Sequence, residues 1–139
     1  MRSTSFFGYL LTLGTAACSS ALPSATNTDS LQGTWASDQV TLTITDSNAN
    51  LQLLASGGCF GSYGQIPQAV PLRHFSIPGT YTQLTGAFPG KVDYPAQYSG
   101  GLDGADLVLT ITVPTLPLSI GPIRLTAGRT HNWLACLYP

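Results

Sequence analysis

Two stretches of strict alternation between apolar and polar side chains constrain the fold of this chain more than any other feature. In residues 40–45, the apolar Val40, Leu42 and Ile44 alternate with three threonines. In residues 107–113, the same period of two places a leucine, isoleucine or valine at every odd position. Successive side chains of a β-strand point to opposite faces of a sheet, so this pattern predicts strands with one buried face.

Turn-forming residues separate the predicted strands at short intervals. Residues 46–50 have turn chemistry, and the dipeptide Asp103-Gly104 favours a tight hairpin before the strand at 107–113. Further short strands are expected at residues 33–35, 51–55, 69–72, 75–77, 98–102, 123–126 and 133–137. Fifteen glycines and ten prolines leave little room for long helices. The sequence therefore predicts an all-β fold, a small antiparallel barrel or sandwich of about eight short strands.

Two glycine-containing segments are expected to be loops. Residues 56–64 hold four glycines and two aromatic residues around Cys59, and residues 84–94 combine glycine, proline and aromatic residues. Loops on a rigid β scaffold are common places for binding sites.

The first residues have the order of an export signal. Arg2 precedes an apolar run at residues 6–13, and small residues follow at 14–17. The apolar run is too short to cross a bilayer, which takes about 20 residues in a helix. The sequence thus predicts a signal peptide over residues 1–17.

The end of this segment, Ala16-Ala17-Cys18, resembles the lipobox of bacterial lipoproteins. That resemblance implies cleavage before Cys18, lipid attachment to Cys18 and anchoring to the membrane through this lipid. Residues 18–30 would then form a lipid-anchored flexible tether, and residues 31–139 a single β domain. In a host with two membranes, Ser19 resembles the signal for sorting to the outer membrane, so the domain would lie there or on the periplasmic face. The alternative is an ordinary signal peptide and a secreted protein without lipid.

The chain has three cysteines, at positions 18, 59 and 136. If Cys18 carries lipid, Cys59 and Cys136 remain, and an oxidising compartment would allow them to pair. They could instead be buried free thiols. A metal site is not expected, because neither a CxxC motif nor clustered histidines accompany them.

The segment Gly33-Thr34-Trp35 resembles the GxW motif that opens lipocalins. The resemblance implies that Trp35 closes the base of a barrel, with Arg124 or Arg129 packed over it by a cation–π contact.

A broader resemblance spans residues 33–139 and is to small exported bacterial β domains of uncharacterised function. It is carried by Trp35, the strand at 40–44, Cys59, residues 77–81, residues 95–100, the strand at 107–113 and Cys136. It implies a Cys59–Cys136 disulfide and the domain boundaries, but no activity.

The chemistry of the side chains argues against several functions. Only 8% of residues are charged, with five basic and six acidic side chains, which excludes a nucleic-acid-binding surface. The chain has no glutamate and no GxSxG elbow, and its two histidines, His74 and His131, are far apart in the sequence. We therefore expect no enzyme activity, no catalytic residues, no metal site and no cofactor.

Two functions are the main hypotheses, and an enzyme or a β-barrel inhibitor of extracellular enzymes is a further alternative. The first is an envelope-anchored lipoprotein with a non-catalytic β domain that binds a protein or a cell-envelope component. The alternative is a lipocalin-like carrier of a small hydrophobic ligand. The candidate residues for the pocket of such a carrier are Trp35, Phe75, Tyr81, Tyr98 and Trp133.

Overall fold

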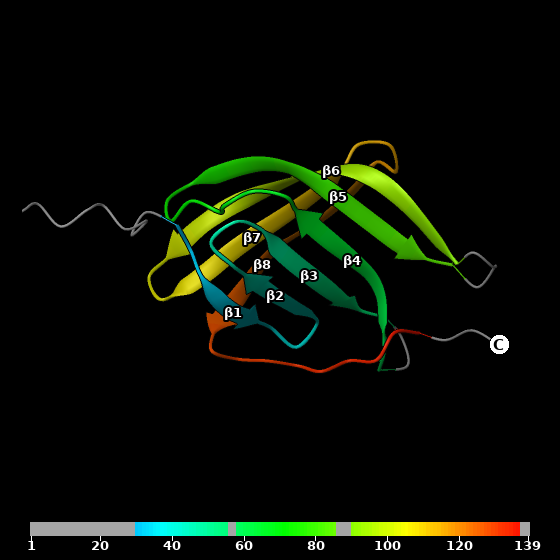
Figure 1. Ribbon diagram of the computed structural model, residues 1–139, viewed down its shortest axis with the longest axis horizontal. Helices are drawn as coiled ribbons and strands as arrows, with labels where there is room; N and C mark the ends of the chain where they lie inside the picture. The colour runs from blue at the N-terminus through cyan, green and yellow to red at the C-terminus, as the bar shows by residue number, and fades with distance from the viewer. Residues whose placement is uncertain (1–29, 56–57, 86–89, 137–139) are drawn as a thin grey trace, which may run out of the picture.

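A computed structural model describes residues 30–55, 58–85 and 90–136 of the chain. It contains eight strands, each antiparallel to its neighbours in the sequence, with the first and last strands paired to close a barrel (Figure 1). The strands are β1 (Gly33–Ala36), β2 (Val40–Ile44), β3 (Ala49–Leu54), β4 (Phe60–Ile66), β5 (Phe75–Leu84), β6 (Lys91–Asp103), β7 (Asp106–Val113) and β8 (Leu118–Ala127). The predicted all-β fold with about eight short antiparallel strands is confirmed, and of the two predicted architectures, a barrel or a sandwich, the structure has the closed barrel.

The N-terminal predictions lie outside this part of the chain. The signal at 1–17, the lipid site Cys18 and all of the tether except Ser30 belong to residues that the structure does not describe. Within the described ranges, no helix is long and apolar enough to cross a membrane.

The alternating segments supply the barrel interior. Val40, Leu42 and Ile44 are all nearly inaccessible to solvent, and the odd-numbered residues 107–113 are completely buried. On the opposite side of β2, Thr43 is exposed as the alternation requires, but Thr41 is only 8% exposed. Thr41 lies on the outside of the barrel and is nevertheless buried, so another part of the chain covers it.

The hairpin between β6 and β7 forms where the sequence predicts it. Asp103 pairs with Asp106, and Gly104 is the first residue of the two-residue turn between them. The φ of Gly104 is 63°, a left-handed value that a type II′ turn requires at this position and that glycine adopts without strain.

Several predicted boundaries were wrong. The segment 69–72 is not a strand, although Pro71 forms an isolated bridge with Ser30. Of the strand expected at 133–137, the structure describes residues 133–136, and these contribute one parallel bridge, between Ala135 and Phe60. Strands β4 and β6 begin inside the two segments expected to be loops. Strand β5 continues through Pro78-Gly79 to Leu84, well beyond the predicted end at residue 77.

Candidate functional site

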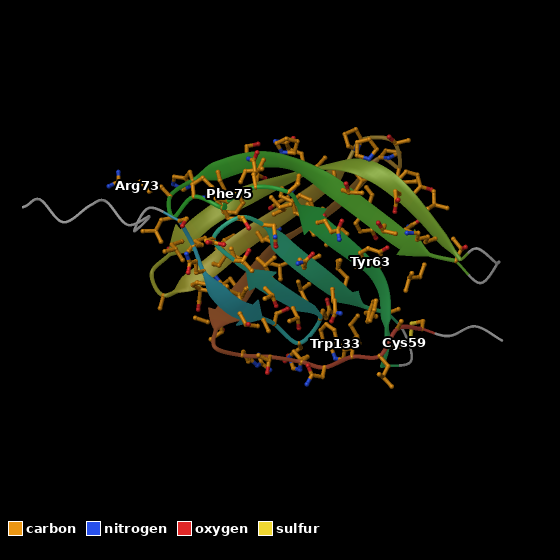
Figure 2. The ribbon with its side chains drawn as sticks, viewed as in Figure 1. Cys59, Tyr63, Arg73, Phe75 and Trp133 are labelled. Carbon is orange, nitrogen blue, oxygen red and sulfur yellow. A yellow bond between two sulfur atoms is a disulfide. The ribbon has the colours of Figure 1, made fainter. Side chains whose placement is uncertain are left out.

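Four of the five predicted pocket residues lie together inside the barrel. Trp35, Phe75, Tyr81 and Tyr98 all belong to the hydrophobic core and are at most 8% exposed. Trp133 does not join them, because it follows β8 on a segment that runs outside the barrel (Figure 2). The structure therefore separates the one C-terminal candidate from the other four.

Tyr98 fills the space beside two glycines of neighbouring strands. A Cβ atom on Gly64 would lie 2.0 Å from the Tyr98 hydroxyl oxygen, and one on Gly79 would lie 2.7 Å from the edge of its ring. The hydroxyl donates a hydrogen bond to the carbonyl oxygen of Thr80 at 2.7 Å. Burial raises the pKa of the Tyr98 phenol far above its ordinary value, and neighbouring Tyr81 raises it further. Around Tyr98, the interior of the barrel is therefore occupied by the protein's own side chains.

The two arginines proposed to cover Trp35 pair with carboxylates instead. Arg124 binds Asp103 and Asp106 on the β6–β7 hairpin, and Arg129 binds Asp38 in the turn after β1. The Asp103 hydrogen bond is the main cause that raises the pKa of Arg124, with a smaller contribution from Asp106. These ion pairs are exposed, so each contributes little to stability.

A segment after β8, residues 128–136, covers part of the outer surface and is called the C-terminal strap below. At its start, the Gly128 amide donates to the Thr34 carbonyl at 2.8 Å. At its far end, the Phe60 amide donates to the Leu134 carbonyl, and the Cys136 amide donates to the Phe60 carbonyl. The strap thus connects the end of β8 to the start of β4 and passes over the barrel between them (Figure 1, orange to red).

A disulfide between Cys59 and Cys136 fixes the far end of the strap, with their Cα atoms 5.0 Å apart. Figure 2 places Cys59 at the start of β4, beside the end of the strap. The expected pairing of these two cysteines is therefore present, and its location shows what it does: it holds the strap against the barrel.

A hollow of about 320 Å³ lies between the C-terminal strap and the outer surface of β1, β2 and β3. Its floor consists of hydrogen-bonding side chains on the outward positions of these strands, namely Thr34, Thr41, Thr43, Asn50 and Gln52. Its roof consists of three consecutive strap residues, Thr130, His131 and Asn132. The strap therefore covers a polar surface rather than extending the apolar core.

Two buried polar atoms at this hollow have no hydrogen-bond partner, the Thr41 hydroxyl oxygen in the floor and His131 Nε2 in the roof. The His131 imidazole stacks on the Trp133 indole, with ring centres 4.9 Å apart and an angle of 5° between the planes. An unpaired buried polar group costs free energy, so the free protein carries this cost at the contact between the strap and β2.

A second hollow of about 350 Å³ adjoins the first through Asn50, which lines both. It extends over Gln65 towards the β2–β3 turn at Ser47 and Asn48. The two hollows together are called the polar groove. The lining residues that the structure describes include no Asp, Glu, Lys or Arg, and His131 is the single titratable group among them.

The sequence alone does not predict this groove. The alternation in residues 40–45 marks the β2 threonines as an outward-facing row, and nothing in it indicates that a later segment covers them. One signal was available: in an extended segment, residues two apart point to the same side, so His131 and Trp133 are expected to form a pair. In the described ranges, three or more His, Cys, Asp or Glu side chains nowhere gather as a metal site requires.

Comparison with protein-family models, curated proteins and solved structures yields no match to this chain.

Proposed function

We propose that this protein is an exported, lipid-anchored envelope protein whose barrel is a non-catalytic binding domain. The polar groove is the proposed binding surface, and a component of the cell envelope is the proposed partner. One observation carries the proposal: a disulfide-held strap covers hydrogen-bonding side chains and leaves two buried polar atoms unpaired. A segment that served only to cover the barrel would gain more by burying apolar surface.

The packing inside the barrel favours the outer groove over a carrier pocket. Tyr98 occupies the space above Gly64 and Gly79, and Ile111 and Leu109 are completely buried beside it in the core. A hydrophobic ligand would have to displace these side chains from a closely packed interior, at considerable cost. A titration with fatty acids and hydrophobic dyes that gave a saturable fluorescence change would instead favour the carrier.

The proposed location rests on the N-terminal pattern and on the disulfide. Disulfides are typical of exported proteins, because the cytosol keeps most thiols reduced. The intact mass of the protein, taken from the native membrane fraction, tests the anchor. A mass equal to residues 18–139 plus acyl chains is expected, whereas the mass of the unmodified chain would overturn lipidation at Cys18.

The binding proposal is tested by co-sedimentation of the full chain with envelope fragments isolated from the host. We expect saturable binding that Asn50→Ala and Gln52→Ala weaken, because both amides line the hollow. Matched controls are Ser76→Ala and Gln97→Ala, which remove an exposed side-chain pair on β5 and β6, away from the groove. Equal loss in both sets, or no loss in either, would overturn the groove as the binding surface.

A further inference from the structure

We infer that the polar groove binds an uncharged, hydroxyl-rich glycan chain. This inference rests on the proposed function and adds the chemical class of the ligand. It follows from three properties of the groove, namely the absence of charge on its described lining, the two unpaired buried atoms at it and the row of hydrogen-bonding side chains along it.

The lining matches a neutral ligand better than a charged one. An ionic ligand that enters the hollow loses water, and no lining side chain of the described residues carries a fixed opposite charge to compensate it. The amides of Asn50, Gln52 and Asn132 each offer donors and an acceptor, and the threonine hydroxyls offer both. Sugar hydroxyls are likewise donors and acceptors at the same time, so each can pair with this lining.

The two unpaired atoms lie in opposite walls of the same hollow. The Thr41 hydroxyl is in the floor, and His131 Nε2 is in the roof. Protein covers both atoms in the free molecule, so a ligand hydroxyl reaches them only when the strap moves away from the floor. A ligand hydroxyl has one donor and two acceptor positions, so it could then donate to one atom and accept from the other. That pairing would remove a free-energy cost that the free protein carries.

The outward side chains form a row across four strands that follows the curved outer surface of the barrel. Thr34 is opposite Thr43, Thr43 opposite Asn50, and Asn50 opposite Gln65. Adjacent strands lie about 4.8 Å apart, so the row presents a hydrogen-bonding group at regular steps through both hollows. Such a row fits an oligomer of repeating units that follows the curve of the barrel.

Isothermal titration of the full, lipid-bearing chain in detergent tests the inference. The probes are neutral β-1,4-linked hexasaccharides of N-acetylglucosamine and of glucose, with an oligogalacturonate as the anionic comparison. We expect saturable binding of a neutral probe, weakened about fivefold or more by Asn50→Ala or Gln52→Ala. Gln97→Ala should leave the affinity unchanged, because it alters a different part of the surface.

A second measurement locates the bound sugar without any substitution in the floor of the groove. The chain has two tryptophans, and only Trp133 belongs to the strap, where it stacks on His131. We expect the neutral probe to shift the indole N–H resonance of Trp133, identified with Trp133→Phe, and to leave that of buried Trp35 in place. A shift confined to Trp35 would overturn the inference.

Two results separate failure of this inference from failure of the proposed function. If envelope fragments bind in a manner that depends on Asn50 and Gln52 but no neutral hexasaccharide does, the glycan is wrong and the binding surface stands. If the anionic oligogalacturonate binds more strongly than the neutral probes, the inferred ligand class is likewise wrong and the binding surface stands. If envelope binding does not depend on Asn50 or Gln52, the proposed function fails, and this inference fails with it.

Discussion

The hydroxyl oxygen of Tyr98 lies 2.0 Å from the point at which a side chain on Gly64 would begin. These residues belong to β6 and β4, which are not neighbours in the barrel, so the tyrosine extends across the strand between them. Its hydroxyl then bonds to the carbonyl of Thr80 on that intervening strand, β5. One side chain thereby connects three strands, and it leaves room only for glycine at position 64.

Replacement of Gly64 by alanine should reduce the free energy of unfolding by about 1–3 kcal/mol, because the new methyl group overlaps the Tyr98 hydroxyl. Urea denaturation measures the loss. In a Tyr98→Phe background the same replacement should cost less, since the nearest atom is then absent. Equal losses in the two backgrounds would show that the contact between Gly64 and Tyr98 is not the cause.

Tyr98 should make stability depend on alkaline pH. Its pKa is raised in the folded state, so its contribution is complete below about pH 10, where the unfolded phenol ionises, and is lost as the pH rises towards the folded value. Relative to Tyr98→Phe, the free energy of unfolding of the unaltered protein should fall by about 1.4 kcal/mol per pH unit above pH 10. Urea titrations between pH 9 and 11 measure the difference, and parallel pH profiles would contradict it.

Replacement of Thr41 by valine should stabilise the free protein by about 1 kcal/mol, because it removes a buried hydroxyl that has no partner and keeps the side-chain shape. Thr43→Val is the matched control, since Thr43 is two residues away on the same strand but exposed, and it should change stability by less than about 0.5 kcal/mol. Thermal unfolding compares the pair. A destabilised Thr41→Val protein would mean that the hydroxyl has a role in the free state.

Removal of the disulfide should loosen the C-terminal strap before the barrel. For Cys59→Ala combined with Cys136→Ala, the expected loss in the free energy of unfolding is about 2–5 kcal/mol. Amide exchange should increase across residues 128–136, whereas β7, whose odd-numbered side chains are all buried, should stay protected. Equal acceleration in β7 and the strap would show that the barrel cannot form without this cross-link.

The sequence predicted the fold best where a single local pattern was sufficient to define a strand or a turn. Alternation in β2 and β7 and the Asp103-Gly104 turn gave strand positions and faces, because each depends on nearby residues alone. Strand β4 was missed because Gly61 and Gly64 resembled loop residues. Gly64 is small because of Tyr98, which is 34 residues away in the sequence, and only the folded chain brings the two together.

The candidate site was less predictable for a related reason. Hydrogen-bonding residues on an outer sheet face are common, and nothing local marks the ones that another segment will cover. The pairing of Cys59 with Cys136 was expected, but the direction of the intervening strap across β1, β2 and β3 was not. The buried state of Thr41 therefore became evident only from the structure.

The barrel closes where β1 meets β8, and these two strands pair at only two positions, Trp35 with Ala127 and Ala36 with Thr126. A pull on the chain at Ser30 loads the bridge to Pro71 and the Leu31–Val70 hydrogen bond first, and then reaches this short seam through β1. The strap begins beside β8 and is covalently attached beside the start of β4. It therefore spans the outer surface of β1, β2 and β3. If the seam opens, the disulfide-held strap therefore still connects β8 to β4.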